Sequence, residues 1–133
     1  MDAMAQLNKE DMAALTEQFI QYIEDSVVRL GEMALQISPG TLLERDVSDE
    51  VFGIAHNIKG MGTTFGYDLL TSIGESLCDY GKKTDPSGNV SSNVVLGHIK
   101  AIQLVFDHRI SGTGGIKGQE LLDSLHQIVT EDL

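Results

Sequence analysis

One histidine in this sequence has unusual neighbours for a residue in a helix. Gly53 precedes His56 by three positions, and Lys59 and Gly60 follow it at three and four positions. Residues at these spacings share one face of a helix, so the four would lie side by side. Each glycine inside a helix costs about 1 kcal/mol of helix stability relative to alanine. Two such costs beside one histidine favour a functional explanation. Without side chains at positions 53 and 60, the helix backbone is accessible there, so another protein can approach it closely.

An exposed histidine with a nearby lysine is suited to few kinds of chemistry. A general base would need a partner nucleophile or an orienting carboxylate, and a cleft that excludes water, and no such second group is evident. A metal site would need two to four ligands at helical spacing. The three other histidines make no i,i+3 or i,i+4 pair with another histidine or with the single cysteine, so we expect no metal site. The remaining role is that of a nucleophile that carries a group covalently, and Lys59 could offset the charge of a phosphoryl group.

The helix that carries His56 is expected to begin near Ser48, a good N-cap residue. Its inward stripe is expected to consist of Val51, Ile54, Ala55, Ile58, Met61, Gly62 and Phe65. Gly62 on this stripe predicts a close contact with another helix, and Gly66 predicts the end of the helix at a tight corner. His56 lies about 100° around the helix from Ala55, beside the stripe rather than within it. We therefore expect its imidazole to be exposed.

A long helix is expected before the His-bearing one, over about Asn8–Ser38. Asn8 is suited to cap its start, and Ser38-Pro39-Gly40 ends it. Its apolar residues recur every three or four positions and are Met12, Leu15, Phe19, Ile23, Val27, Leu30, Ala34 and Ile37. This period is that of an amphipathic helix with one wide apolar stripe.

Three further helices are expected after the His-bearing one. The third runs from about Asp68 to Lys82, the fourth is capped by Ser92, and a shorter fifth follows the glycine-rich segment 111–118. Their inward residues are expected to be Leu70, Ile73, Leu77 and Tyr80, then Val95, Ile99, Ile102, Phe106 and Ile110, then Leu122, Leu125 and Val129. No alternating strand pattern, repeat or long linker interrupts them. The pattern predicts an all-α fold, an antiparallel four-helix bundle with an appended C-terminal helix, as a single domain over residues 1–133.

Composition excludes several classes of partner. The 133 residues carry a net charge of −11, and their nine basic residues are scattered, with Lys82 and Lys83 as the only adjacent pair. We therefore expect neither a nucleic-acid partner nor an anionic membrane partner. Cys78 is the only cysteine, which suits a reducing compartment. The segment Met1–Lys9 lacks the pattern of a signal peptide, and no apolar run is long enough to span a membrane, so a cytoplasmic location is expected.

The residues around His56 resemble a known family signature. Positions 55–67 read AHNIKGMGTTFGY. This segment resembles the signature of histidine phosphotransfer (HPt) domains: His, any residue, an aliphatic residue, Lys, Gly, small residues, an apolar residue and Gly. It is similar to the phosphorylated N-terminal domain of chemotaxis histidine kinases, which shares the Thr-Phe-Gly-aromatic ending. The expected order of the helices extends the resemblance to most of the chain.

The resemblance implies a phosphoryl carrier in a multistep two-component (His-Asp) phosphorelay. His56 would accept a phosphoryl group from a receiver-domain aspartyl phosphate or a sensor histidine kinase, and pass it to another response-regulator receiver. Lys59 would neutralise the phosphoryl oxygens, and Gly60 would let the receiver dock. Further docking residues are expected around His56 at Gly53, Thr63 and Phe52, the last as an exposed apolar residue. The chain would bind no cofactor, since Mg²⁺ and the catalytic acids belong to the receiver, and it would act as a monomer without ATP-binding or autokinase activity.

Two positions depart from the family pattern. Met61 stands where a small residue is usual, but helical geometry points it about 140° away from His56, so we expect it to affect packing. Chemotaxis kinases place an acid on the following helix that hydrogen-bonds the phosphorylated histidine. The comparable position here is at about Cys78, with Glu75 one turn earlier. This departure weakens direct phosphorylation by a chemotaxis-type kinase and leaves transfer from a receiver untouched.

A second His-Lys pair lacks the required spacing. His98 is followed by Lys100 at i+2, on the opposite side of a helix, and Ile102 takes the place of the glycine. We expect His98 to be structural or surface-facing.

Two other functions stay open: a helical adaptor that binds receiver or kinase domains without being phosphorylated, and the detached substrate domain of a larger histidine kinase.

Overall fold

The computed structural model describes residues 8–132. Its five α-helices are α1 (Lys9–Gln36), α2 (Arg45–Met61), α3 (Asp68–Thr84), α4 (Ser92–Asp107) and α5 (Gly115–Asp132). Two short 3₁₀ turns, η2 (Thr63–Phe65) and η3 (Asp85–Ser87), follow α2 and α3. The predicted all-α class is confirmed for the described residues. Residues 1–7, which carry most of the argument against a signal peptide, lie outside them.

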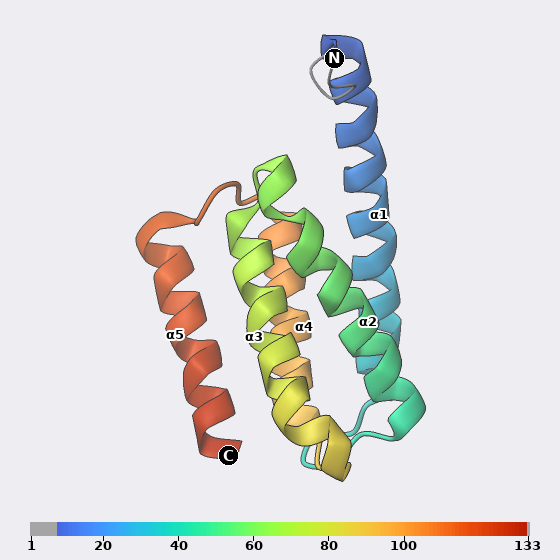
Figure 1. Ribbon diagram of the computed structural model, residues 1–133. Coiled ribbons are helices and arrows are strands. Elements are labelled where there is room, and N and C mark those ends of the chain that lie inside the picture. Colours follow the sequence, from blue (N-terminus) through green and yellow to red (C-terminus); the bar gives the residue numbers. More distant parts are fainter. Residues whose placement is uncertain (1–7, 133) are drawn as a thin grey trace.

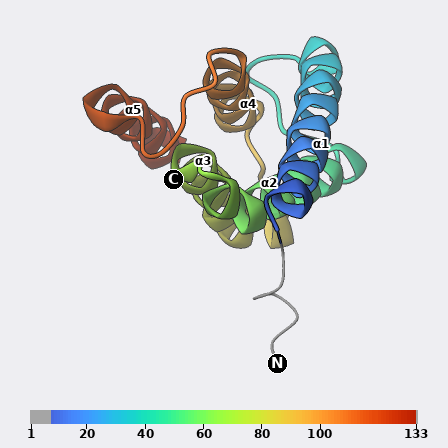
Figure 2. The same ribbon diagram turned by 90° about the horizontal axis from the view of Figure 1, so that it is seen from above.

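The five helices pack in a defined set of pairs (Figure 1). α2 packs most extensively against α3, α1 packs against α4 and α2, and α4 also packs against α3. α5 lies beside α3 and α4, on the far side from α1 and α2, as the view from above shows (Figure 2). The glycine-rich connection before α5 leads the chain out to this position.

One apolar cluster lies between the helices. Ile23 of α1, Ile58 of α2, Leu70 of α3 and Ile99 of α4 are all almost completely excluded from solvent, and Leu125 joins them from α5. Burial of such a side chain stabilises the fold by about 1.5–3 kcal/mol. These residues belong to the predicted inward stripes, so the helical period in the sequence identifies the core correctly.

The apolar stripe of α1 is buried only from Phe19 onward. Met12 and Leu15, at the start of the predicted stripe, are 45% and 38% exposed. The reason is geometric, because the N-terminal turns of α1 project past the ends of the other helices (Figure 1). Among residues 8–132, no other helix reaches this part of α1 to cover the stripe.

The predicted cap of α1 is confirmed, whereas that of α2 is wrong. Asn8 accepts a hydrogen bond from the backbone N–H of Asp11 at 2.9 Å. α2 begins at Arg45, three residues before Ser48, and Ser48 is buried inside its first turn. The Ser48 hydroxyl lies 3.0 Å from the carbonyl oxygen of Arg45 and 3.1 Å from the carboxylate of Asp85, which also pairs with Arg45. The serine therefore links the start of its own helix to the turn after α3 and does not cap α2.

The cap predicted for α4 is shifted by one residue. Ser91 is the N-cap, and Ser92 is the first residue of the helix. Ser92 is buried, and its hydroxyl accepts a hydrogen bond from the backbone N–H of Thr41 at 2.9 Å. It thereby ties the start of α4 to the segment that joins α1 and α2.

The tight corner predicted after α2 is confirmed and packs against α1. Gly66 has a φ of 85°, a left-handed conformation that glycine adopts without strain. The ring of Phe65 stacks on Phe19 of α1 with centroids 4.5 Å apart, and Tyr67 meets the same ring at 5.8 Å. The second half of the HPt-like segment thus fixes the end of α2 to α1.

His98 is structural, which agrees with one of its two predicted roles. It is fully buried in α4, where its Nδ1 lies 2.7 Å from the carbonyl oxygen of Val94 and its Nε2 lies 2.9 Å from the hydroxyl of Ser76. A carbonyl can only accept, so Nδ1 carries the proton and Nε2 accepts from the hydroxyl. Burial lowers the pKa of His98 below its ordinary value.

We predict that His98 makes the protein less stable in mild acid. Its pKa is lower in the folded state than in the unfolded chain, where it is near 6.5. The contribution of His98 to the free energy of unfolding is therefore fully present above about pH 6.5. It is lost as the pH drops through that value towards the folded-state pKa. Urea unfolding at pH 7.5 and at pH 5.5 measures this loss. His98→Gln should lose less stability between these two pH values than the wild type, and an equal loss in both proteins would contradict the prediction.

Candidate functional site

The outer surface of α2 presents the predicted site residues next to α3. His56, Gly53 and Gly60 are exposed, and Lys59 is half-buried one turn after the histidine. The structure therefore places His56 beside the apolar stripe, as predicted, because its neighbour Ala55 is the residue that enters the core. A rigid helix presents an accessible imidazole to solvent.

The glycines of α2 and its C-cap have two different structural settings. A Cβ atom added at Gly53 or Gly60 would meet no atom within 4 Å. A Cβ added at Gly62 would overlap the Thr71 hydroxyl and lie 2.8 Å from the carbonyl oxygen of Tyr67. Packing therefore requires glycine at position 62, as predicted. It does not require glycine at positions 53 and 60, which flank His56.

Lys59 carries a positive charge that is available to a ligand. Its side chain takes part in none of the ion pairs found within residues 8–132. Burial raises the pKa of the half-buried Cys78 thiol of α3, while the nearby charge of Lys59 acts in the opposite direction. Lys59 therefore lies on the α3 side of α2, close to Cys78.

Thr63 and Phe52, two of the proposed docking residues, differ in how far they are exposed to solvent. Thr63 is exposed, and its backbone N–H donates to the Thr71 hydroxyl at 2.8 Å. Phe52 was expected to be exposed, but it is half-buried. Its ring lies over Gly81 of α3, where an added Cβ would meet ring atoms at 2.8 Å. Phe52 thus packs mainly within the fold, and only part of its surface can reach a partner.

A hydrogen bond beside His56 was not predicted from the sequence. The side-chain amide of Asn57 donates to the hydroxyl of Tyr22 on α1 at 2.8 Å. Asn57 directly follows His56, so this bond ties α1 to the turn of α2 that carries the histidine. The half-buried Met61 packs against the core, as its predicted direction required.

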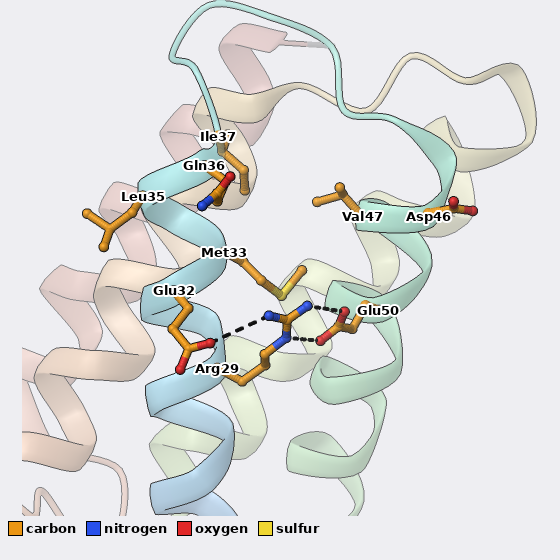
Figure 3. Close-up of a pocket in the computed structure, with 9 residues that line it drawn as sticks. All are labelled: Arg29, Glu32, Met33, Leu35, Gln36, Ile37, Asp46, Val47 and Glu50. Carbon is orange, nitrogen blue, oxygen red and sulfur yellow. Dashed lines mark hydrogen bonds and ion pairs between the residues drawn. The ribbon is translucent and has the colours of Figure 1, made fainter.

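A groove of about 590 Å³ lies elsewhere, between the C-terminal part of α1 and the first turns of α2 (Figure 3). Arg29 of α1 makes a two-point ion pair with Glu50 of α2, with the second contact at 2.8 Å. This pair lowers the pKa of the Glu50 carboxyl, chiefly through the hydrogen bond from Arg29. None of the predicted site residues lines this groove.

Residues 8–132 give no indication of metal binding or of insertion into a membrane. Within residues 8–132, no three His, Cys, Asp or Glu side chains are grouped so that they could hold a metal ion. No helix in the same range combines the length and the apolar composition that crossing a membrane requires.

Comparison of the chain with protein-family models, with curated proteins and with solved structures finds no match. The functional interpretation rests on the residues around His56.

We predict opposite effects on stability from the same substitution at two nearby glycines. Gly60→Ala should stabilise the fold by up to about 1 kcal/mol, because alanine favours the helix and its methyl group enters open space. Gly62→Ala should destabilise it by about 1–3 kcal/mol, because its methyl group overlaps atoms of Tyr67 and Thr71. Urea unfolding of both variants measures the difference. A destabilised Gly60→Ala would show that Gly60 has a structural role after all.

Proposed function

We propose that this protein is an HPt phosphoryl carrier of a multistep two-component phosphorelay. One observation carries the proposal: an exposed His56 with a lysine one turn away, between glycines that packing does not require. The resemblance of positions 55–67 to the HPt signature is in agreement. We interpret α1–α4 as the antiparallel four-helix bundle of such a domain and α5 as its appended helix.

The reaction would be an in-line transfer from a receiver's aspartyl phosphate to the imidazole. The unprotonated ring nitrogen of His56 uses its lone pair to form the N–P bond, and the P–O bond to the aspartate breaks. The aspartate leaves with that electron pair as a carboxylate. The proton on the other ring nitrogen can then pass to water, which leaves a neutral imidazole ring bearing the phosphoryl group. Transfer to a second receiver reverses these steps.

The side chains of this protein would contribute position and charge. The α2 backbone fixes the point from which His56 projects, so less positional freedom is lost when the receiver arrives. The ammonium of Lys59 lies one helical turn away and would attract the phosphoryl oxygens. The receiver would bring the catalytic acids and Mg²⁺, which offsets charge on the transferring group. In this proposal the chain acts in the cytoplasm as a monomer and does not phosphorylate itself.

A receiver is favoured over a chemotaxis-type kinase as the source of phosphate. The α3 position near Lys59 carries Cys78, and burial raises the pKa of its thiol, which favours the neutral form. A neutral thiol cannot replace the carboxylate that accepts a hydrogen bond from the histidine in such kinases. Transfer from a receiver does not depend on this carboxylate.

We predict that phosphate appears on His56 as an acid-labile, base-stable phosphoramidate. The experiment incubates the protein with a phosphorylated receiver and follows the label on the chain. His56→Gln should accept no phosphate and should change stability by less than about 0.5 kcal/mol, because the side chain is exposed. His126→Gln, at an exposed histidine of α5, is the matched control and should be labelled like the wild type. Full labelling of His56→Gln would refute the assignment, and binding without labelling of the wild type would indicate an adaptor.

We also predict that bulk at position 60 blocks the receiver. Gly60→Arg should fold with unchanged helicity, since the added side chain enters open space. Its positive charge should attract an acidic receiver, so charge cannot explain a loss of binding. Transfer from the phosphorylated receiver should fall at least tenfold, which is about 1.4 kcal/mol in the barrier. A transfer time course gives the rate and circular dichroism checks the fold. Normal transfer by a folded Gly60→Arg would show that receivers do not approach over this face.

A further inference from the structure

The α2 turn that carries His56 rests directly on a glycine of α3. A Cβ atom added at Gly74 would lie 2.8 Å from the carbonyl oxygen of Ala55, and 3.0 Å and 3.3 Å from the backbone N and Cα of Lys59. All three are main-chain atoms. They are held in the helical hydrogen-bond pattern of α2, in which the N–H of residue 59 bonds to the carbonyl of residue 55. A side chain could turn aside from such a contact, but this backbone cannot.

Any residue larger than glycine at position 74 would therefore move α2 relative to α3. Ordinary van der Waals contact begins near 3.4 Å, so the contact to Ala55 alone requires a shift of about 0.6 Å. The displaced segment would be the turn from Ala55 to Lys59, which includes His56. The shift would thus displace His56 and Lys59, the two side chains that would hold the phosphoryl group.

Two half-buried helix glycines elsewhere do not have this effect. A Cβ added at Gly97 of α4 would meet the Ile128 side chain at 3.2 Å, and one at Gly31 of α1 would meet the Gln103 side chain at 3.1 Å. Both neighbours are flexible ends of side chains on other helices. Gly74 alone among these three is in contact with the backbone beneath the site.

We propose that Gly74 is a positioning residue for phosphotransfer. It acts through the α2 backbone and sets where His56 and Lys59 stand relative to the surface of α3. This inference rests on the proposed function. A receiver that covers His56 also covers part of α3, because Phe52 and Lys59 on either side of the histidine both lie against that helix. The imidazole must then meet the phosphorus in line while the receiver is docked on both helices.

The test compares Gly74→Ala with the wild type in transfer from a phosphorylated receiver, measured over a range of receiver concentrations. A misplacement of 1 Å can cost about a hundredfold in rate, so a shift of about half that size should cost about tenfold. The maximal rate per folded molecule should fall about tenfold, whereas the half-saturating receiver concentration should change less than about twofold. A residue with a purely structural role would leave both quantities unchanged per folded molecule.

Gly97→Ala is the matched control, because it makes the same change in a helix interior against a flexible side chain. It should leave the maximal rate unchanged. Amide chemical shifts of Gly74→Ala should change most over residues 55–60, and those of Gly97→Ala should not change there. If Gly74→Ala is too unstable at 25 °C, all proteins are measured in trimethylamine N-oxide, which strengthens folding.

The outcomes separate the inference from the proposed function. If the wild type accepts no phosphate, the proposed function fails and the inference fails with it. If the wild type transfers normally and folded Gly74→Ala keeps the full maximal rate, the proposed function stands and the positioning role of Gly74 is overturned. An equal loss of rate in Gly74→Ala and Gly97→Ala would also overturn it.

Discussion

The close contact between α2 and α3 is the constraint on which the site depends. Gly74 brings the α3 backbone against the α2 backbone at Ala55 and Lys59, and Gly81 accommodates the ring of Phe52 on the same pair of helices. At Gly74 the two backbones are too close for a side chain to lie between them, and His56 projects outward beside this contact. The exposure of the histidine and the burial of its neighbour Ala55 are thus two consequences of one packing arrangement. The remaining helices close the core behind this pair.

The other contacts of α2 hold the same turn from different directions. The Asn57–Tyr22 hydrogen bond ties it to α1 on one side. The stacked rings of Phe65 and Phe19 anchor the corner that follows the helix. A turn held on these sides has little freedom to move when a partner docks, which is the property that a rapid, reversible transfer of a phosphoryl group needs. The exposed glycines add access without loosening this support, because they face solvent rather than the core.

The sequence predicted the helices and the exposure of His56 correctly, because the signals for both were local. Apolar spacing identified core residues such as Ile58 and Leu70, and the offset of His56 from Ala55 predicted its exposure. The sequence also predicted correctly that packing requires glycine at position 62, which lies on the apolar stripe, but not at position 60, which does not. Helical period and rotation around one helix are sufficient for all of these predictions.

Features that depend on two distant segments could not be predicted in this way. Ser48 was predicted to be a cap, but its hydroxyl lies between the carbonyl of Arg45 and the carboxylate of Asp85, which is 37 residues further along the chain. Phe52 was predicted to be an exposed docking residue, but its ring covers Gly81 of α3. The role of Gly74 was likewise hidden, because an isolated glycine in a helix shows nothing about the backbone that it contacts. Each case requires the packing of one helix against another segment.

The most direct measurement of the central claim is the detection of the N–P bond itself. The protein is labelled with ¹⁵N-histidine, incubated with a phosphorylated receiver, and studied by ³¹P NMR with ¹⁵N correlation at alkaline pH. The account predicts one phosphoramidate signal, coupled to a ring nitrogen whose resonance is assigned to His56. A phosphorus signal coupled to another histidine, or a protein that binds the receiver and shows no such coupling, would contradict it.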